Sequence, residues 1–188
     1  MSRIIAGVAG GTSLTSVPGQ GTRPTTDRVK EALFSRLDAY NILNGAHVLD
    51  LFAGSGSLGV EAASRGASAV DLVESAEKAA AACRANADAM NRVLGWTCVR
   101  VHRSKVETYL NRVSEDALWD VVLMDPPYPL EDAALMTVLS SLARHLAEGA
   151  VVVLERSSRS VEPVWPAGIE RFAEKKYGET RLWFLEPA

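Results

Sequence analysis

Short runs of consecutive apolar residues alternate with amphipathic stretches over most of the chain, from residue 47 to residue 154. The spacing predicts strands at 48–52, 69–73, 98–102, 121–124 and 151–154, and helices at 57–65, 76–92, 105–112 and 131–146. A strand that is apolar throughout is buried on both faces. Alternation of such strands with helices is typical of a parallel sheet that helices cover on both sides. The pattern therefore predicts an α/β fold with a doubly wound, mostly parallel sheet.

Two further strand-like runs, at 170–176 and 180–185, end the sequence. Only Tyr177, Gly178 and Glu179 separate these runs. Such a short link can join antiparallel strands, but it cannot hold the long crossover that parallel strands need. We therefore expect a seven-stranded sheet that is completed by a C-terminal antiparallel hairpin.

The first 20 residues differ from the rest of the chain, because they are rich in Gly, Ser and Thr. This composition predicts a short N-terminal β-hairpin arm rather than a part of the core. A helix start signal follows at Thr26-Asp27. Since 188 residues suit one domain, the predicted division is an arm at 1–22 and a single α/β domain at 23–188.

A glycine-rich turn stands between the first strand and the helix that follows it. Residues 50–59 read DLFAGSGSLG and contain the spacing G-x-G-x-x-G. Glycines let the backbone of such a turn approach a ligand closely, and the helix N-terminus offers free N–H groups. Glu74 ends the second strand, where a carboxylate can accept both hydroxyls of a ribose. This layout predicts a nucleoside cofactor and leaves two classes open, the nicotinamide dinucleotides and S-adenosylmethionine.

A second motif, Asp125-Pro126-Pro127-Tyr128, follows the fourth strand. In a doubly wound sheet this position lies in the crevice where ligands bind. The prolines remove two N–H donors, so the Asp125 carboxylate and a nearby carbonyl can hold the two hydrogens of an exocyclic amino group. Tyr128 offers a flat face on which a base can stack. These groups can direct the amino nitrogen at an electrophilic methyl group without a metal, so the motif favours methyl transfer over dehydrogenation.

The formal net charge of −3 argues against a nucleic-acid partner, but the charges are segregated along the chain. Residues 1–36 carry five basic and two acidic side chains, and residues 78–112 carry seven basic and two acidic ones. Because binding depends on the local field, both segments are candidates for RNA contacts. No apolar stretch is long enough for a bilayer and no secretory signal is recognisable, so we expect a cytoplasmic protein that binds no membrane. The spacing of histidines and cysteines predicts no metal.

These motifs make the chain similar to a known family. It resembles the bacterial 16S ribosomal RNA guanine-N2 methyltransferases, within the Rossmann-like class I methyltransferases that use S-adenosylmethionine. The resemblance rests on residues 3–7 (RIIAG), 23–34 (RPTTDRVKEALF), 50–59, 61–62, 64–67 and 125–128. It implies that residues 23–188 form the methyltransferase domain.

The resemblance also implies a set of site residues. Implied cofactor contacts are Asp50, Phe52, Ala53, Gly54, Ser55, Gly56 and Gly59 in the turn, Glu74 and Ser75 after the second strand, and Ser104, Lys105 and Val106 beside the adenine. Implied catalytic residues, which hold the target guanine, are Asp125, Pro126, Pro127 and Tyr128. Candidate contacts to the RNA are Arg3, Arg23, Thr25 and Arg28.

The implied substrate is one guanine of 16S rRNA, methylated by a monomer in a partly assembled particle that contains small-subunit ribosomal proteins. Members of the family carry a basic run after the segment equivalent to 3–7, whereas residues 9–13 are uncharged here. The basic segment 78–112 is therefore an alternative RNA surface. Other functions stay open: an amino methyltransferase for DNA adenine or a protein amide, a nicotinamide-dependent oxidoreductase, and a non-catalytic RNA-binding factor.

Overall fold

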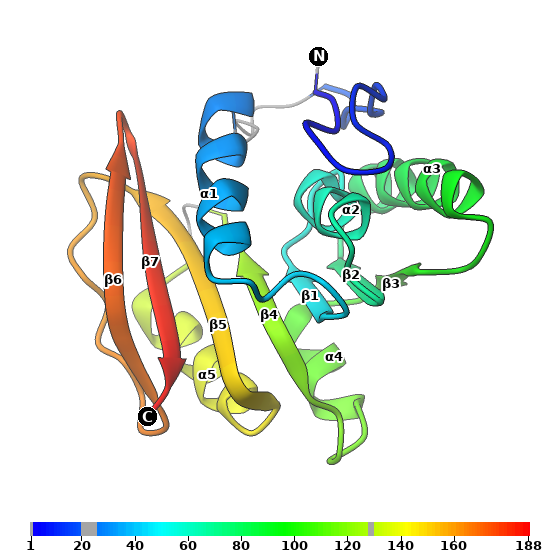
Figure 1. The fold of residues 1–188 in the computed structure, drawn as a ribbon. Coiled ribbons are helices and arrows are strands. Elements are labelled where there is room, and N and C mark those ends of the chain that lie inside the picture. The colour runs from blue at the N-terminus through cyan, green and yellow to red at the C-terminus, as the bar shows by residue number, and fades with distance from the viewer. Residues whose placement is uncertain (1, 20–25, 128–129) are drawn as a thin grey trace.

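The computed structural model describes residues 2–19, 26–127 and 130–188. Within these residues, the strands form a seven-stranded sheet in the order β3-β2-β1-β4-β5-β7-β6 (Figure 1). The strands are β1 (His47–Leu51), β2 (Ala69–Glu74), β3 (Val99–Arg103), β4 (Trp119–Met124), β5 (Leu146–Ser157), β6 (Ile169–Tyr177) and β7 (Thr180–Pro187). Strands β1 to β5 are parallel, and β7 is antiparallel to β5 and β6. The predicted sheet with its C-terminal hairpin is confirmed.

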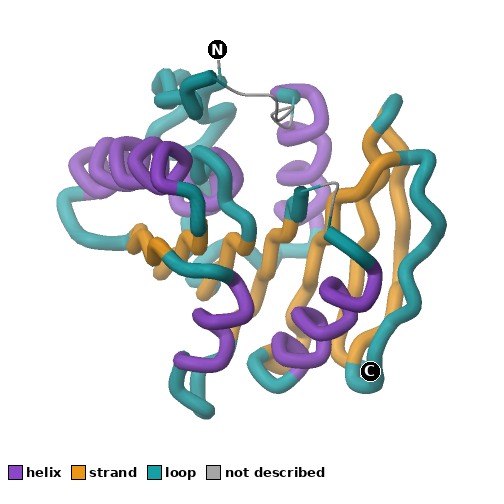
Figure 2. The backbone as a smooth tube through the Cα atoms, turned by 180° about the vertical axis from the view of Figure 1, so that it is seen from behind, coloured by secondary structure: helices purple, strands orange, loops and turns teal. Residues whose placement is uncertain are grey.

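Helices cover both faces of this sheet. They are α1 (Asp27–Ala39), α2 (Ser57–Ser64), α3 (Glu77–Leu94), α4 (Val106–Arg112) and α5 (Asp132–Ala143). One apolar cluster joins the sheet to α1, α2 and α3, and a second cluster joins it to α4 and α5, which lie in front in Figure 2. Neighbouring strand residues such as Val48 and Leu49 belong to different clusters. Because successive side chains point to opposite faces, both faces need apolar residues, which explains the continuous apolar runs.

Strand β5 is longer than the apolar run at 151–154 that predicts it. Its last residues, Glu155 to Ser157, pair with Leu182, Arg181 and Thr180 of β7. Polar residues extend the strand here because the hairpin supplies backbone partners for them. Because of this pairing, β5 ends at the same edge of the sheet as β4.

The N-terminal segment differs from its expectation. Residues 2–14 form a loop that is closed by a single antiparallel bridge between Arg3 and Ser13, rather than a regular hairpin. Ile4, Ala9 and Leu14 are buried in the same apolar cluster as α1, α2 and α3. The prediction that this segment stays outside the core was therefore wrong. Its apolar residues are few, but their placement makes them part of the core.

Polar side chains of two helices hold the N-terminal segment in place. Glu61 accepts hydrogen bonds from the backbone N–H groups of Ile5 and Ala6, at 2.8 and 3.1 Å. Ser64 of α2 receives the N–H of Ala9 and donates its hydroxyl to the Ala6 carbonyl. Asn86 of α3 both accepts from and donates to the backbone of Thr15. The segment is thus an integral layer over α2 and α3, as Figure 1 shows.

Glu61 is also the centre of a buried ion network. Its carboxylate lies 2.8 Å from Arg65 and 3.6 Å from Lys30, and the Glu61 and Lys30 side chains are fully buried. Burial lowers the pKa of Lys30, and the Glu61 charge opposes that effect. The Lys30 ammonium donates to the carbonyl of Arg3 at 2.6 Å. The network therefore ties α1, α2 and the N-terminal segment together.

Candidate functional site

The glycine turn connects β1 to α2 and has a backbone that few residue types can adopt. Phe52, Gly54 and Gly56 all have positive φ, at 59°, 61° and 82°. A Cβ on Gly56 would also lie 2.7 Å from the Leu72 side chain, whereas a Cβ on Gly54 would meet nothing within 4 Å. Gly56 is therefore required both by its conformation and by packing, and Gly54 leaves open space beside the turn. A non-glycine residue at positive φ is uncommon, and such residues gather at binding sites.

Two carboxylates accept hydrogen bonds from backbone N–H groups in and beside the turn. Asp50, at the end of β1, is buried and accepts the N–H of Gly59 at 3.0 Å. Glu74, at the end of β2, accepts the N–H of Gly54 at 2.8 Å and that of Ala76 at 2.9 Å. Each oxygen of a carboxylate has two acceptor positions, so Glu74 retains capacity for a ligand.

Burial has a marked effect on Asp50. It raises the pKa of the Asp50 carboxyl well above its ordinary value, the hydrogen bond from Gly59 opposes this shift, and the charge of Glu74 adds to it. A positive charge placed near Asp50 would favour the ionised carboxylate.

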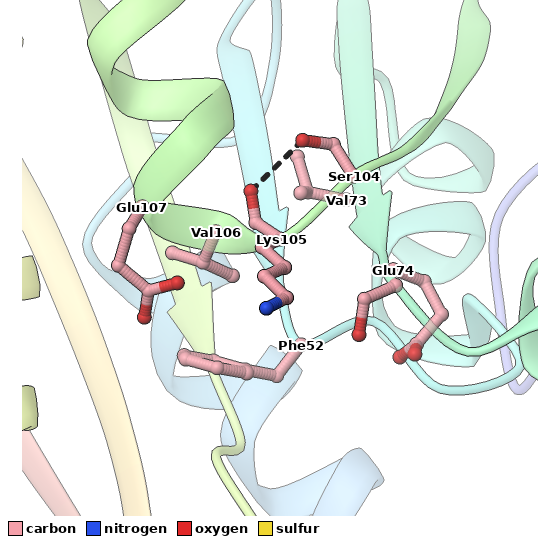
Figure 3. A pocket seen from close by; sticks show the side chains of 8 residues that line it. Phe52, Val73, Glu74, Ser104, Lys105, Val106 and Glu107 are labelled. Carbon is pink, nitrogen blue, oxygen red and sulfur yellow. Dashed lines mark hydrogen bonds between the residues drawn. The ribbon is translucent and has the colours of Figure 1, made fainter.

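A pocket opens beside the turn, between the ends of β1, β2 and β3. Its lining residues are Phe52, Val73, Glu74, Ser75, Ser104, Lys105, Val106 and Glu107. Figure 3 shows the Val106 side chain above the Phe52 ring, the Lys105 side chain reaching toward the gap between them, and the Glu74 carboxylate to one side. Ser104 donates its hydroxyl to the Lys105 carbonyl. Two apolar side chains next to a carboxylate fit a nucleoside, which has a flat base and a ribose with hydroxyls.

The lining of the pocket overlaps with the cofactor contacts that the resemblance implies. Six of its lining residues belong to the predicted cofactor contacts: Phe52, Glu74, Ser75, Ser104, Lys105 and Val106. Val73 and Glu107 were missed. Glu107 is an exposed residue in the first turn of α4, and its place directly after the predicted contacts 104–106 was the available signal.

The Asp-Pro-Pro motif lies at the end of β4. Strands β1 and β4 are paired with Leu51 opposite Met124, so Asp125 starts its loop beside the glycine turn. Asp125 is half-buried, Pro126 is buried and Pro127 is exposed. The carbonyl of Pro127 accepts the N–H of Leu130 at 2.9 Å. The two motifs therefore share one edge of the sheet, as predicted.

The structure describes two of the four candidate RNA contacts. Arg28 is exposed in the first turn of α1, and Arg3 is exposed in the N-terminal segment. Arg23, Thr25 and Tyr128 lie outside the described residues. Arg84, Arg92 and Arg100 of the basic segment 78–112 are exposed on α3 and β3.

In the part of the chain that the structure describes, no cluster of three or more His, Cys, Asp or Glu side chains could hold a metal ion. No helix among those residues has the length and apolar character needed to cross a membrane.

The chain is similar to known proteins over nearly its whole length. Residues 2–186 match the family described as Conserved hypothetical protein 95. The chain is 32% identical over 179 residues to ribosomal RNA small subunit methyltransferase D of Escherichia coli K12, across 94% of this chain and 85% of that protein. It is similar to the structure of a hypothetical protein from Thermus thermophilus, with a TM-score of 0.80, 31% identity and 98% of both chains covered.

A more distant structure extends the comparison of the fold. Magnesium protoporphyrin IX methyltransferase of Synechocystis PCC 6803, solved with bound SAM, has a TM-score of 0.64 and 15% identity, over 89% of this chain and 87% of that one. At that identity the likeness concerns the fold alone. The sheet order and the glycine turn thus define a Rossmann-like class I methyltransferase fold.

The family follows from the match over nearly the whole chain. The protein belongs to the family described as Conserved hypothetical protein 95, and it is a homologue of the bacterial small-subunit rRNA methyltransferases D. The resemblance to 16S rRNA methyltransferases that the sequence motifs indicated is confirmed at this level.

Proposed function

We propose that this protein transfers a methyl group from S-adenosylmethionine to the exocyclic N2 of a guanine in 16S rRNA. The observation that carries the proposal is the pairing of β1 with β4, which places the glycine turn and Asp125 at one edge of the sheet. A cofactor in the turn and an amino group at Asp125 would therefore be neighbours. The homology to the small-subunit rRNA methyltransferase D of Escherichia coli supports the substrate class.

The residues present fit S-adenosylmethionine. Gly54 leaves open space beside the turn, and Phe52 and Val106 border a slot for the adenine. Glu74 has acceptor capacity for the ribose hydroxyls, and Asp50 holds the turn through the N–H of Gly59. When bound, the cofactor supplies an electrophilic methyl group on a sulfonium.

The loop after β4 would prepare the target nitrogen. The lone pair of a guanine amino group is delocalised into the ring, so that nitrogen is a weak nucleophile. The Asp125 carboxylate and a carbonyl of the Pro126-Pro127 turn accept its two hydrogens and aim the lone pair at the methyl carbon. The amino nitrogen would take the methyl group as the sulfonium leaves as a neutral thioether, and the nitrogen would then pass one proton to the Asp125 carboxylate that holds it. Tyr128 is proposed to stack on the target base.

The proposed setting is a monomer acting in the cytoplasm on an assembling small subunit, where ribosomal proteins present the RNA. Arg3, Arg23, Thr25 and Arg28 are proposed as RNA contacts. Of these, Arg28 lies on the exposed first turn of α1 and Arg3 is exposed beside the same helix, where the Lys30 ammonium holds its carbonyl.

Methyl transfer from labelled cofactor tests this function directly. The protein is incubated with deproteinised small-subunit rRNA and with assembled small subunits, and the modified position is mapped. We expect label on the N2 of one guanine. Label on DNA adenine or on a protein amide would instead establish the related amino methyltransferase, and cofactor binding without turnover would indicate an RNA-binding factor. Tight NAD binding without S-adenosylmethionine binding would contradict methyl transfer altogether.

The variant Glu74→Gln tests the cofactor site separately. The Gln amide has one acceptor oxygen, whereas the Glu74 carboxylate has two. Both carboxylate oxygens already accept backbone N–H groups, those of Gly54 and Ala76, so the amide has less acceptor capacity left for a ligand. Hydrogen bonds to a charged group contribute about 1.5–3 kcal/mol, so the Kd for S-adenosylmethionine should rise roughly 10- to 100-fold in calorimetric titration. Glu77→Gln, at an exposed residue three positions further on, is the control and should bind as the wild type does. An unchanged Kd in Glu74→Gln would remove Glu74 from the site.

A further inference from the structure

Three cationic side chains lie in one row across the last three strands of the sheet. The register pairs Arg156 of β5 with Arg181 of β7, and Arg181 with Lys176 of β6. Directly paired residues share a face of the sheet. The preceding pair on this face, Leu154 and Trp183, packs into the cluster that includes α5. The Arg156–Arg181–Lys176 row therefore lies on the α5 side of the sheet, beyond that cluster.

The charge of the row is only partly compensated. In the described part of the chain, Arg181 pairs with Glu174 at 3.4 Å, with side chains that are 26% and 44% exposed. Neither Arg156 nor Lys176 has a carboxylate partner there. Like charges opposite each other on paired strands destabilise a sheet. An anion bound at the row would relieve this repulsion.

Packing and hydrogen bonding fix the position of Arg181. Its guanidinium lies over the ring of Trp183, 5.4 Å from the centroid, and pairs with Glu174. The Arg181 side chain is 26% exposed, and Lys176 is exposed. The row thus presents fixed positive charge at the surface.

The row begins at the loop that carries the candidate target site. The Arg156 guanidinium donates to the carbonyl of Leu130 at 3.4 Å, and the N–H of Leu130 donates to Pro127. In Figure 1, β4, β5 and β6 point to the same edge of the sheet, and β7 starts there. Neighbouring strands lie about 4.8 Å apart, so the row extends roughly 10 Å away from the Pro127 loop.

We propose that the Arg156–Arg181–Lys176 row binds the phosphate backbone of the RNA strand next to the target guanine. This inference rests on the proposed function and names a surface for its substrate. Arg156 lies nearest the target loop, so it binds the phosphate closest to the target guanine. Arg181 and Lys176 bind backbone positions further out. Guanidinium and ammonium groups form charge-assisted hydrogen bonds with phosphate, and such contacts dominate affinity for RNA.

Two adjacent lysines of β6 provide a matched test. Lys176 belongs to the row, whereas Lys175 pairs with Leu182, which packs on the α1 side of the sheet. Both lysines are exposed and carry the same charge. Lys176→Gln and Lys175→Gln therefore remove equal charge from opposite faces.

We expect Lys176→Gln to raise the KM for RNA roughly three- to tenfold, because one phosphate contact is lost. The slope of log KM against log salt concentration should fall by about 0.7–0.9. The kcat at saturating RNA and the Kd for S-adenosylmethionine should stay at their wild-type values. Lys175→Gln should match the wild type in all four measurements. The substrate is whichever of deproteinised rRNA or assembled subunits the wild type methylates.

Arg181 provides a second arm of the test. Arg181→Lys keeps the charge and should retain the wild-type slope of log KM against log salt concentration. In Arg181→Gln that slope should fall by about 0.7–0.9, as in Lys176→Gln. A wild-type KM and a wild-type salt slope in both Lys176→Gln and Arg181→Gln would refute phosphate binding by the row. The proposed function would remain intact. Equal rises in the KM for RNA in Lys176→Gln and Lys175→Gln would also overturn the proposal. The effect would then depend on total charge and not on the face of the sheet that carries it. Absence of RNA methylation by the wild type would instead refute the proposed function itself.

Discussion

Asp125→Ala is expected to lower the rate of methyl transfer about 100- to 1,000-fold while the Kd for S-adenosylmethionine stays within about twofold of the wild type. The reason is that Asp125 follows β4 directly beside the glycine turn, where its carboxylate is proposed to hold the target amino group. A 1,000-fold loss corresponds to about 4 kcal/mol of transition-state stabilisation. Single-turnover transfer of labelled methyl to RNA measures the rate, and calorimetric titration measures cofactor binding.

Asp132→Ala is the matched control for this experiment. Asp132 is an exposed carboxylate in the first turn of α5, seven positions after Asp125. It is expected to keep the wild-type rate. Turnover of Asp125→Ala within about tenfold of the wild type would show that another group positions the amino nitrogen, since removal of a single positioned hydrogen-bonding group costs about 100- to 1,000-fold.

Glu61→Gln is expected to lower the free energy of unfolding by about 3–5 kcal/mol. Glu61 is fully buried, receives two backbone N–H groups of the N-terminal segment and faces both Lys30 and Arg65. The amide keeps the shape of the side chain but leaves the buried Lys30 ammonium without its counter-charge. Urea unfolding at neutral pH measures the change.

A second ion pair of Arg65 provides the comparison. Arg65 lies 2.8 Å from Asp38, whose side chain is 49% exposed. Asp38→Asn should cost less than about 1 kcal/mol, because exposed ion pairs contribute little. Hydrogen exchange at the Ile5 amide should accelerate in Glu61→Gln and not in Asp38→Asn. Equal stability losses in the two variants would contradict a central role for Glu61.

The apolar runs of the sequence were sufficient to predict most of the fold. A run such as 121–124 must be buried on both faces, and this requirement is local, so it can be recognised without knowing the neighbours. The three-residue link at Tyr177 to Glu179 was likewise enough for the antiparallel hairpin, because a parallel crossover does not fit into it. The pocket residue Glu74 followed from its position at the end of the second strand, whereas Val106 was implied by the family resemblance.

The N-terminal segment could not be placed in this way. Its composition is that of a surface turn, and its partners Glu61 and Asn86 stand 56 and 71 residues away from Ile5 and Thr15. Burial of Ile4 and Leu14 depends on those distant polar side chains, which accept the backbone N–H groups of a segment without regular structure. A local pattern contains no information about such partners.

The distribution of charge shows the same division between sequence and tertiary structure. By itself, the sequence determined the alternating fold and the two motifs at strand ends, because apolar runs, glycines and prolines act locally. Residues 149–188 balance at six basic and six acidic side chains, so composition predicted no RNA surface there. Only the pairing of β5, β7 and β6 decided that Arg156, Arg181 and Lys176 share one face. The physical reason is that strand register sorts neighbouring charges onto opposite faces of a sheet, and register is a property of the folded chain.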